Sequence, residues 1–587
     1  MVGAAMRSSR LLLGLAAVAV AFAAADTYVV VLALPDMMGS VGIPVDQLQR
    51  AAPIISGFLL GYVAMLPLIG RVADLRGRVP VLVAALALFA LGSLVTALAY
   101  DMPSMVSGRF LQGVGGGGLV PATLALVADL YPAERRGVPL GVVSAVQELG
   151  SVLGPLFGAL VLAVADWRAI FAINLAVGLV LAAVIRRLAR VDPPETFGRV
   201  NGRFDWIGVL LALVALVAGG LVFVEPSQLM RDLTWGQLFI PVTGSGRWLT
   251  PLGLTAIGAL LLLGARCVTA RRPLLDLRSW LRTLREADLL GAVFLALALA
   301  GVILAFATAD PKVQVFSDQG LWYLLGSGLA TAAFVVHLRS APAPLVPAGA
   351  LRRTPAWGAM LVSFFVGAAL IAALIDIPLF ARTTVYSDSQ LMAALVLVRF
   401  LVALPVGAVV GGYLTRTTSA GLVTAVGMAC AAGGFLWMAT WDLHSLDHVT
   451  ATLPLVLGGF GFGLALAPVN AAVLASTDAA VHGLASAFVV VARMVGMLVG
   501  ISALTTIGLR RYYAEQADLP PAREVCDGRT RCSEFTELLK TAGIAQEHTV
   551  FTGAAVCAVI AGVAALVLFR HAATRAISTG DLLRSAG

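Results

Sequence analysis

Sixteen apolar runs, each long enough to cross a lipid bilayer, restrict this chain to a polytopic membrane protein. A helix that spans a hydrocarbon core about 30 Å thick needs about 20 mostly apolar residues. Six runs lie at 11–34, 51–70, 79–100, 104–128, 138–165 and 168–185. Four lie at 206–224, 249–266, 288–308 and 321–338, and six more at 356–381, 391–413, 420–440, 452–476, 483–509 and 549–569. We therefore predict an all-α integral membrane protein with sixteen transmembrane helices.

The composition agrees with this class and excludes a soluble globular protein. Of the 587 residues, 59% are hydrophobic and 12% are charged, whereas soluble domains contain ~45–50% apolar and ~25% charged residues. The first run follows Arg7 and Arg10 and passes through Ala23, as a signal peptide would. It continues to Leu34, so a retained membrane helix is the favoured interpretation and a cleaved signal peptide is the alternative.

The basic residues predict how the helices are oriented. Most arginines lie in loops on the same side as the N-terminus, and cytoplasmic loops are the ones enriched in Lys and Arg. With an even number of crossings, both termini are expected in the cytoplasm and the helices in the plasma membrane. The same rule accounts for the net charge of +8, so no nucleic-acid partner is implied.

A repeated glycine spacing divides the chain into homologous parts. Gly137, Gly150 and Gly154 are separated by 13 and 4 residues, and the same spacing recurs between Gly483 and Gly500. Transporter folds are built from repeated helix bundles of this kind, with the substrate site between them. The predicted parts are an N-terminal six-helix bundle (1–190), a central linker with two transmembrane hairpins (191–353), and a C-terminal six-helix bundle (354–587) with an outer extension (510–548).

The two linker hairpins also appear duplicated in sequence. The first opens with Asp-Trp-Ile-Gly at 205–208 and closes with Arg-Pro-Leu-Leu at 272–275. The second opens with Asp-Leu-Leu-Gly at 288–291 and closes with Ala-Pro-Leu-Val at 343–346. This short repeat predicts two related hairpins.

The turn between the second and third runs carries the most specific motif, GRVADLRGR at 70–78. Asp74 can cap the N-terminus of a neighbouring helix, where the helix dipole favours a carboxylate. The run resembles the signature loop of the major facilitator superfamily, and its counterpart in the second half has Thr415 where Asp74 stands. The residues of this predicted gating loop are Gly70, Asp74, Arg76, Gly77 and Arg78.

Two further runs resemble motifs of the same superfamily. Arg109 opens RFLQGVGGGG at 109–118, and the superfamily's equivalent Arg is implicated in proton transfer. The alternative is that Arg109 extends toward the outer membrane surface. The fifth run resembles the antiporter motif that marks exporters, and a Gly-Pro pair inside a helix permits bending. The residues of this motif are Gly150, Gly154, Pro155 and Gly158.

Charged residues within the apolar runs indicate a proton-coupled mechanism, because such residues in membranes mark functional pathways. They are Asp26, Arg109, Glu148, Asp376, Arg399 and Arg493. A carboxyl that alternates between an apolar site and the neighbourhood of an arginine can bind and release a proton. The leading hypothesis has Asp26 and Glu148 respond to protons, with Arg493 as their partner across the two halves. A static structural ion pair is the alternative for each.

Longer runs of sequence resemble the 14-helix drug:proton antiporter family. They are ADTYVVVLALP at 25–35 and DWRAIFAINLAVG at 166–178. QELGSVLGP at 147–155 and VVVARMVGMLVG at 489–500 are similar to the mycobacterial triacylglyceride exporter branch. The resemblance implies a proton-driven exporter of a lipid or lipophilic compound that needs no cofactor and acts with a periplasmic lipoprotein. The hairpin at 206–266 departs from the family and makes sixteen helices instead of fourteen.

The outer extension at 510–548 has two features of its own. The helix predicted at 483–509 is expected to continue through Tyr513, and 533–542 is expected to extend the helix at 549–569 outward. Cys526 and Cys532 lie six residues apart on the outer face, where a disulfide can form. We expect no metal site, because no suitable third ligand accompanies the two cysteines.

Three other classes of function remain as alternatives: an exporter of small amphipathic drugs, a membrane-embedded enzyme and a structural protein of the cell envelope. Export of small amphipathic drugs is compatible with the same apolar cavity. A membrane-embedded enzyme would need a catalytic cluster near an interface, and the six histidines form none in the sequence. No GxxxxGK[ST] phosphate loop is present, which disfavours ATP-driven transport. We therefore predict a transporter and not an enzyme.

Overall fold

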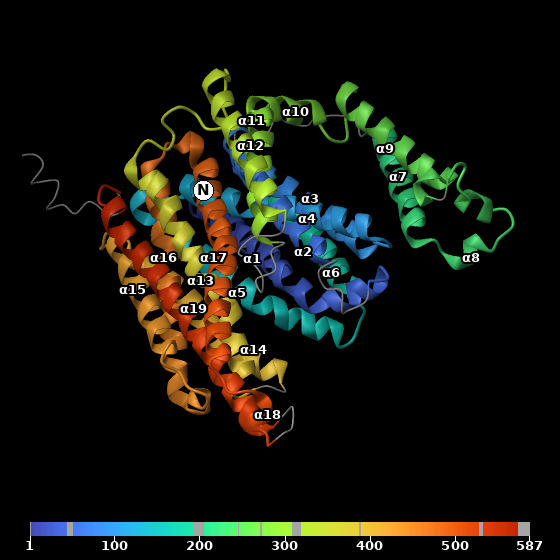
Figure 1. Ribbon diagram of the computed structural model, residues 1–587. Helices are drawn as coiled ribbons and strands as arrows, with labels where there is room; N and C mark the ends of the chain where they lie inside the picture. Colours follow the sequence, from blue (N-terminus) through green and yellow to red (C-terminus); the bar gives the residue numbers. More distant parts are fainter. Residues whose placement is uncertain are drawn as a thin grey trace, which may run out of the picture.

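The computed structural model describes residues 2–43, 51–191, 205–244, 246–270, 273–307, 319–386, 389–527, 532–572 and 574. Within these ranges, sixteen helices are long and apolar enough to cross a membrane, which confirms the predicted number. Helices make up the regular structure of the described residues, so the predicted fold class is also confirmed (Figure 1).

Each half of the molecule contains six long helices. Those of the N-terminal half are α1 (Val2–Ser40), α2 (Ala52–Arg76), α3 (Arg78–Ala97), α4 (Met102–Leu130), α5 (Gly137–Leu162) and α6 (Arg168–Val191). Those of the C-terminal half are α13 (Thr354–Thr383), α14 (Gln390–Leu414), α15 (Ala420–Met438), α16 (Thr452–Ser476), α17 (His482–Ala517) and α19 (Ser533–Leu568).

The two halves share one packing scheme. In the first, α1 packs on α5, α2 and α3 pack on α4, and α3 packs on α6. In the second, α13 packs on α17, α14 and α15 pack on α16, and α15 packs on α19. The halves are therefore structural repeats of each other.

The repeated glycines lie where this scheme brings two backbones together. A Cβ atom at Gly150 would overlap the carbonyl oxygen of Ala21 in α1, and one at Gly496 would overlap that of Phe364 in α13. One turn further on, Gly154 and Gly500 meet the next turn of the same partner helices. Only a residue without a Cβ permits such an approach between membrane helices.

The halves meet through two equivalent seams, α2 against α17 and α5 against α14. Gly70 and Gly483 face each other in the first seam, and Gly137 and Gly412 in the second. All four glycines lie at the end of the bundle that carries the 70–78 loop. We call this end the inner end and the opposite end the outer end, following the orientation predicted from the arginines.

The linker supplies four membrane helices and one amphipathic helix. The membrane helices are α7 (Trp206–Val224), α9 (Pro251–Thr269), α11 (Leu289–Ala307) and α12 (Gly320–Ser340), and α10 (Leu277–Glu286) joins the two hairpins. Short helix α8 (Ser227–Met230) lies in the α7–α9 connection. Helix α11 packs on both α2 and α17, whereas the α7–α9 hairpin projects from the body of the molecule (Figure 1).

An aspartate in the same structural role opens each hairpin. Asp205 accepts hydrogen bonds from the backbone N–H of Gly208 and of Leu274 and from the Arg266 guanidinium. Arg266 and these N–H groups hold the pKa of Asp205 below its usual value. The predicted duplication of the hairpins thus has a structural basis in a shared helix cap.

Asp288 repeats this arrangement in the second hairpin. It accepts from the backbone N–H of Gly291 and Leu345, and His337 takes the place of Arg266 with its Nε2 2.7 Å from Oδ1. Burial raises the pKa of Asp288, but the hydrogen bonds from His337 and the backbone outweigh it, and the pKa is lowered. The carboxylate is therefore the form that holds this turn together.

Helices α17 and α19 extend beyond the outer end, as predicted for this segment. Helix α17 continues through Tyr513 to Ala517, and α19 begins at Ser533. Cys526 and Cys532 form a disulfide between them, with their Cα atoms 5.5 Å apart. Short helix α18 (Ala522–Val525) lies beside it.

The backbone contacts at the repeated glycines predict a position-specific effect of an added methyl group. Gly496→Ala should destabilise the protein by about 1–3 kcal/mol, because overpacking forces α13 and α17 apart. The matched control is Gly219→Ala in α7, where a Cβ meets no atom within 4 Å and alanine improves helix propensity. Thermal unfolding in detergent measures both, and equal melting temperatures for the two variants would contradict the packing argument.

Candidate functional site

Asp26 lies at the centre of a buried polar cluster inside the N-terminal half. Its side chain contacts the Arg109 guanidinium at 2.6 Å, and it also accepts from Gln112 and Asn174. Arg109 is 1% exposed and lies against the ring of Phe58, 4.4 Å from its centroid. The cluster therefore connects α1, α4 and α6 through one carboxylate.

This arrangement corrects two sequence-based interpretations. The expected partner of Asp26 was Arg493, but the structure pairs Asp26 with Arg109 of its own half, so that pairing is wrong. Arg109 is fully buried, so it does not extend to the membrane surface. Gln112 and Asn174 were not predicted as members of the cluster, although both lie within the quoted motif runs, because neither carries a charge.

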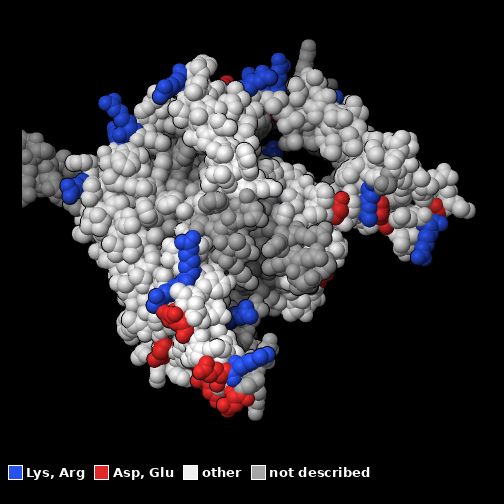
Figure 2. Space-filling view, viewed as in Figure 1, with Lys and Arg blue, Asp and Glu red and all other residues white. Residues whose placement is uncertain are grey.

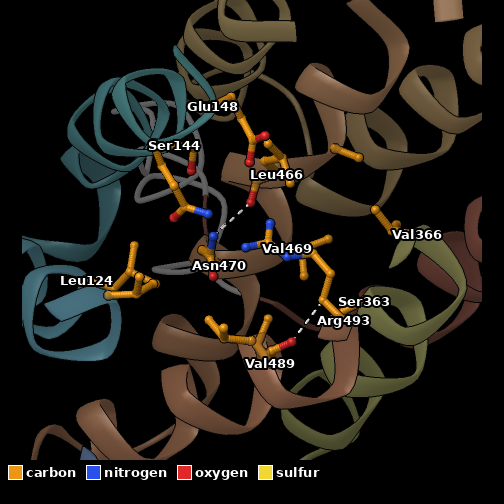
Figure 3. A pocket seen from close by; sticks show the side chains of 14 residues that line it. Leu124, Ser144, Glu148, Ser363, Val366, Leu466, Val469, Asn470, Val489 and Arg493 are labelled. Carbon is orange, nitrogen blue, oxygen red and sulfur yellow. Dashed lines mark hydrogen bonds between the residues drawn. The ribbon is translucent and has the colours of Figure 1, made fainter. Parts of the chain in front are cut away.

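Glu148 and Arg493 line a cavity between the two halves. Glu148 comes from α5 and Arg493 from α17, and both side chains point into the cavity (Figure 3). They form no direct ion pair among the described residues, but the charge of Arg493 acts on Glu148. Of the six predicted intramembrane charges, these are the two that the structure brings together across the halves.

The rest of the cavity wall is mostly apolar, with a few polar side chains. Ser363 donates to the Val489 carbonyl, and the Asn470 Nδ2 donates to the Leu466 carbonyl (Figure 3). The Asn470 Oδ1 is buried and has no partner among the described residues. The other lining residues are Val120, Leu124, Ser144, Gln147, Val366, Ala465, Val469 and Val490.

Asp74 of the 70–78 loop caps α17, as predicted for a neighbouring helix N-terminus. Its two oxygens accept from the backbone N–H groups of Gly483 and Leu484, at 2.8 and 2.9 Å. A carboxylate at this position satisfies two unpaired donors and is favoured by the helix dipole. The cap joins the two halves at the inner end.

The other charged residues of the loop reinforce this contact. Arg78 pairs with Asp74 at 2.9 Å and donates to the Ala479 carbonyl beside the start of α17. Arg76 faces the opposite direction and donates to Ser279 of α10. Gly77 has a φ of +94°, a backbone conformation that glycine adopts without strain.

The counterpart loop of the C-terminal half lacks this link. Thr415 stands where Asp74 would be expected, and its hydroxyl donates to the Gly412 carbonyl of its own helix. Arg136, just before α5, instead donates to carbonyls at the ends of α4 and α16. The two seams therefore share glycine contacts but differ in charge.

The antiporter-motif residues lie within a continuous helix. Pro155 is inside α5, which runs from Gly137 to Leu162 without interruption. Gly150 and Gly154 contact the backbone of α1, and Gly158 is buried. These residues set the distance between α5 and α1 and so the position of Glu148.

Asp376 and Arg399 take part in contacts within the C-terminal half. Arg399 of α14 donates to Thr452 at the start of α16, at 3.1 Å. Asp376 of α13 is buried next to Glu547 of α19. Glu547 was not among the predicted charges, because it lies two positions before the expected start of the last run and was assigned to the outer loop. Among the described residues, no group of three or more His, Cys, Asp or Glu side chains is placed to hold a metal ion.

The buried pair of Asp26 and Arg109 predicts a large stability effect. Asp26→Asn should cost about 3–5 kcal/mol, because it leaves the Arg109 charge buried without a counter-charge. Glu148→Gln is the control, since Glu148 makes no direct ion pair, and it should change stability much less. Thermal unfolding of the two purified variants tests this, and a similar loss in both would contradict the assignment.

Comparisons with known proteins agree with this architecture. The sequence model of the Major Facilitator Superfamily matches residues 16–338. Among solved structures, the human organic anion transporter MFSD10 (TETRAN) has a TM-score of 0.53 and 14% identity, covering 95% of this chain and 99% of that chain. This likeness concerns the fold alone.

Curated relatives are similar over most of the chain. A protein of Mycolicibacterium hassiacum named triacylglyceride transporter is 37% identical over 519 residues, which are 86% of this chain and 81% of the relative. A triacylglyceride transporter of Mycobacterium tuberculosis H37Rv is 34% identical over 529 residues, 87% of this chain and 85% of the relative. These relatives are transporters and not enzymes. The chain therefore belongs to the Major Facilitator Superfamily, in the branch that contains the mycobacterial proteins named triacylglyceride transporters.

Proposed function

We propose that this protein is a proton-coupled exporter of a lipid or lipophilic compound across the plasma membrane. The observation that carries the proposal is the position of Glu148 and Arg493 on opposite halves of one apolar-walled cavity. A carboxyl in such a cavity can exchange a proton, and an arginine across the seam can sense whether it has done so. The transporter uses the proton gradient and needs no bound cofactor.

Protonation of Glu148 changes the attraction between the halves. When Glu148 is ionised, it attracts Arg493 of α17 and favours a narrow cavity. When Glu148 is protonated, this attraction is lost and the halves can move apart to admit substrate. A proton that enters across 100 mV provides about 2.3 kcal/mol, which is enough to bias such an equilibrium.

The contacts between the halves correspond to a state closed at the inner end. Asp74 and the facing glycines join the halves there. At the outer end, a separate hydrophobic cluster around Met37, Trp167 and Phe171 contains residues of the N-terminal half alone. We infer that substrate in the cavity leaves toward the outer side from this state.

The proposed substrate is a neutral lipid, and the proposed direction of transport is from the inner end to the outer extension. The names of the curated relatives and the apolar cavity wall favour a neutral lipid. The extension formed by α17 and α19 offers a surface on which a periplasmic lipoprotein can receive it. Basic side chains gather along the inner end, whereas the extension carries both signs of charge (Figure 2), as expected for cytoplasmic termini.

Gradient-driven transport in inverted vesicles tests this function. Wild type and Glu148→Gln are compared with a fluorescent triacylglyceride and a cationic dye, each measured with and without a proton gradient. We expect gradient-dependent lipid movement in wild type and a loss of at least tenfold in Glu148→Gln, because glutamine cannot exchange a proton. Dye movement that collapses in the variant while lipid stays static would instead identify a drug antiporter.

The Asp74 cap predicts a shift between conformations. Asp74→Ala removes two hydrogen bonds and one ion pair at the inner end, about 1–2 kcal/mol in total, so the share of open inner ends should rise about 5- to 30-fold. The distance between spin labels placed on the inner ends of α2 and α17 reports the share of molecules that are open at this end. Thr415→Ala is the matched control, since its hydroxyl bonds only within α14, and an equal shift in both variants would contradict the role of Asp74.

A further inference from the structure

Two buried carboxyl side chains face each other near the outer end of the C-terminal half. Asp376 of α13 is 3% exposed and Glu547 of α19 is 2% exposed. Helices α13 and α19 pack against each other, which brings the two carboxyl groups next to each other. Gln546 donates to the Oε1 of Glu547 at 3.4 Å, and no N–H or other described donor reaches its Oε2.

Two adjacent buried carboxyl groups are stable together only when one of them holds a proton. Ionised carboxylates only accept hydrogen bonds, so one member of the pair must be protonated to donate. Two carboxylates in contact within a dry site also repel each other strongly, which disfavours double ionisation. The geometry of Asp376 and Glu547 is therefore that of a pair that shares one proton.

The surroundings of the pair are aromatic. Phe380 lies one turn after Asp376, and Phe551 lies one turn after Glu547, with ring centroids 6.4 Å apart. Trp441 contacts both rings, at 5.2 and 6.4 Å. This cluster excludes water from one side of the pair, so water cannot stabilise the two ionised carboxylates in place of the shared proton.

The basic and titratable groups on α19 near the pair are bonded elsewhere. Lys540 donates to the Thr384 carbonyl, and the His548 ring nitrogen lies 2.6 Å from the Trp441 carbonyl. The remaining charged groups on the adjoining elements are exposed to solvent: Arg382 of α13, Asp442 and His444 of the α15–α16 connection, and Arg510 and Arg511 of α17. No ion pair joins any of these described residues to Asp376 or Glu547, so no cation replaces the shared proton.

The pair also lies where the outer extension begins. Residues 533–548 of α19 form one side of the extension and pack along the last turns of α13, where Gly543 meets Thr383. Asp376 and Glu547 lie between these two helices at the base of the extension. Loss of the shared proton would leave two facing carboxylates and separate α19 from α13.

We propose that Asp376 and Glu547 form a second proton-binding site, separate from Glu148, whose proton holds the base of the outer extension against α13. The role of this site in export rests on the proposed proton-coupled function, but the shared proton does not. The extension is thereby fixed while the pair holds its proton and released when the pair ionises. The ligand is a proton, and the site needs no other cofactor.

Infrared spectroscopy of the purified full-length protein tests the proposal. The probe is the C=O stretch of a protonated carboxyl, followed during a titration from neutral to alkaline pH. We expect wild type to show this band at neutral pH and to lose one proton from it on titration, and we expect Asp376→Asn and Glu547→Gln each to lack that component. Glu537→Gln, an exposed carboxyl on the same helix, is the matched control and should keep it.

If a variant fails to fold, the infrared titration of the wild-type protein still tests the proposal. A wild-type spectrum without a titrating protonated carboxyl, or a component that survives in both folded variants, would overturn the proposal. The Glu148→Gln variant distinguishes a failure of this second proton site from a failure of the proposed function. It should abolish gradient-driven export and leave the infrared component of the Asp376–Glu547 pair unchanged.

Hydrogen exchange of the backbone amides tests the mechanical consequence. In wild type, ionisation of the pair at alkaline pH should raise exchange in 540–550 at least tenfold beyond the intrinsic effect of pH. Glu547→Gln should remove this excess, since its amide can donate to Asp376 and has no proton to lose. Equal pH responses in the two proteins would show that the pair does not hold the extension.

Discussion

A charge inside a bilayer must find its partner inside the protein, and this requirement determines where each buried charged side chain of this chain lies. Asp26, Glu148 and Asp376 each meet this requirement in a different way. Asp26 is neutralised by Arg109 and held by neutral amides, which suits a permanent junction of α1, α4 and α6. Glu148 shares a cavity with Arg493 without contacting it, which leaves its protonation free to change the attraction between the halves. Asp376 meets another carboxyl and has no cation, so only a proton can stabilise that contact.

Duplication supplies the framework, and departures from it supply the mechanism. The glycines that bring α1 to α5 and α13 to α17 occupy equivalent positions, as do those at the two seams. The charged residues do not follow this symmetry. Asp74 joins α2 to α17, but Thr415 makes no such link between α14 and α5. The inner end is consequently held on one seam by a charged cap, and on the other side by packing and by the hydrogen bond from Arg136 to the Leu474 carbonyl, so the two seams need not open together.

The features that the sequence predicted correctly depend on local patterns. Apolar run length determines the number of helices, the repeated glycine spacing reports the two related halves, and the repeated Asp-x-x-Gly runs report the two related hairpins. Partner assignment across helices depends on rotation about each helix axis, which run length does not report. That is why Asp26 was matched to Arg493 and why Arg109 was considered for the membrane surface. Glu547 was missed for a related reason. It is a polar residue next to an apolar run and was therefore assigned to a loop, but α19 continues outward from it for about four more turns.

The additional hairpin contacts the transporter at both membrane surfaces. At the outer end, Arg247 lies over the ring of Tyr100 at 4.0 Å, and the Phe223 ring lies 5.7 Å from that ring. At the inner end, α10 holds Arg76 through Ser279 and Trp280. Arg76 is two residues from Asp74, so a movement of α2 that breaks the cap on α17 must either carry α10 with it or break these contacts as well. The linker is thus bound through α10 to the half whose loop closes the inner end, and this attachment adds to the barrier between the two conformations when α10 does not move with α2.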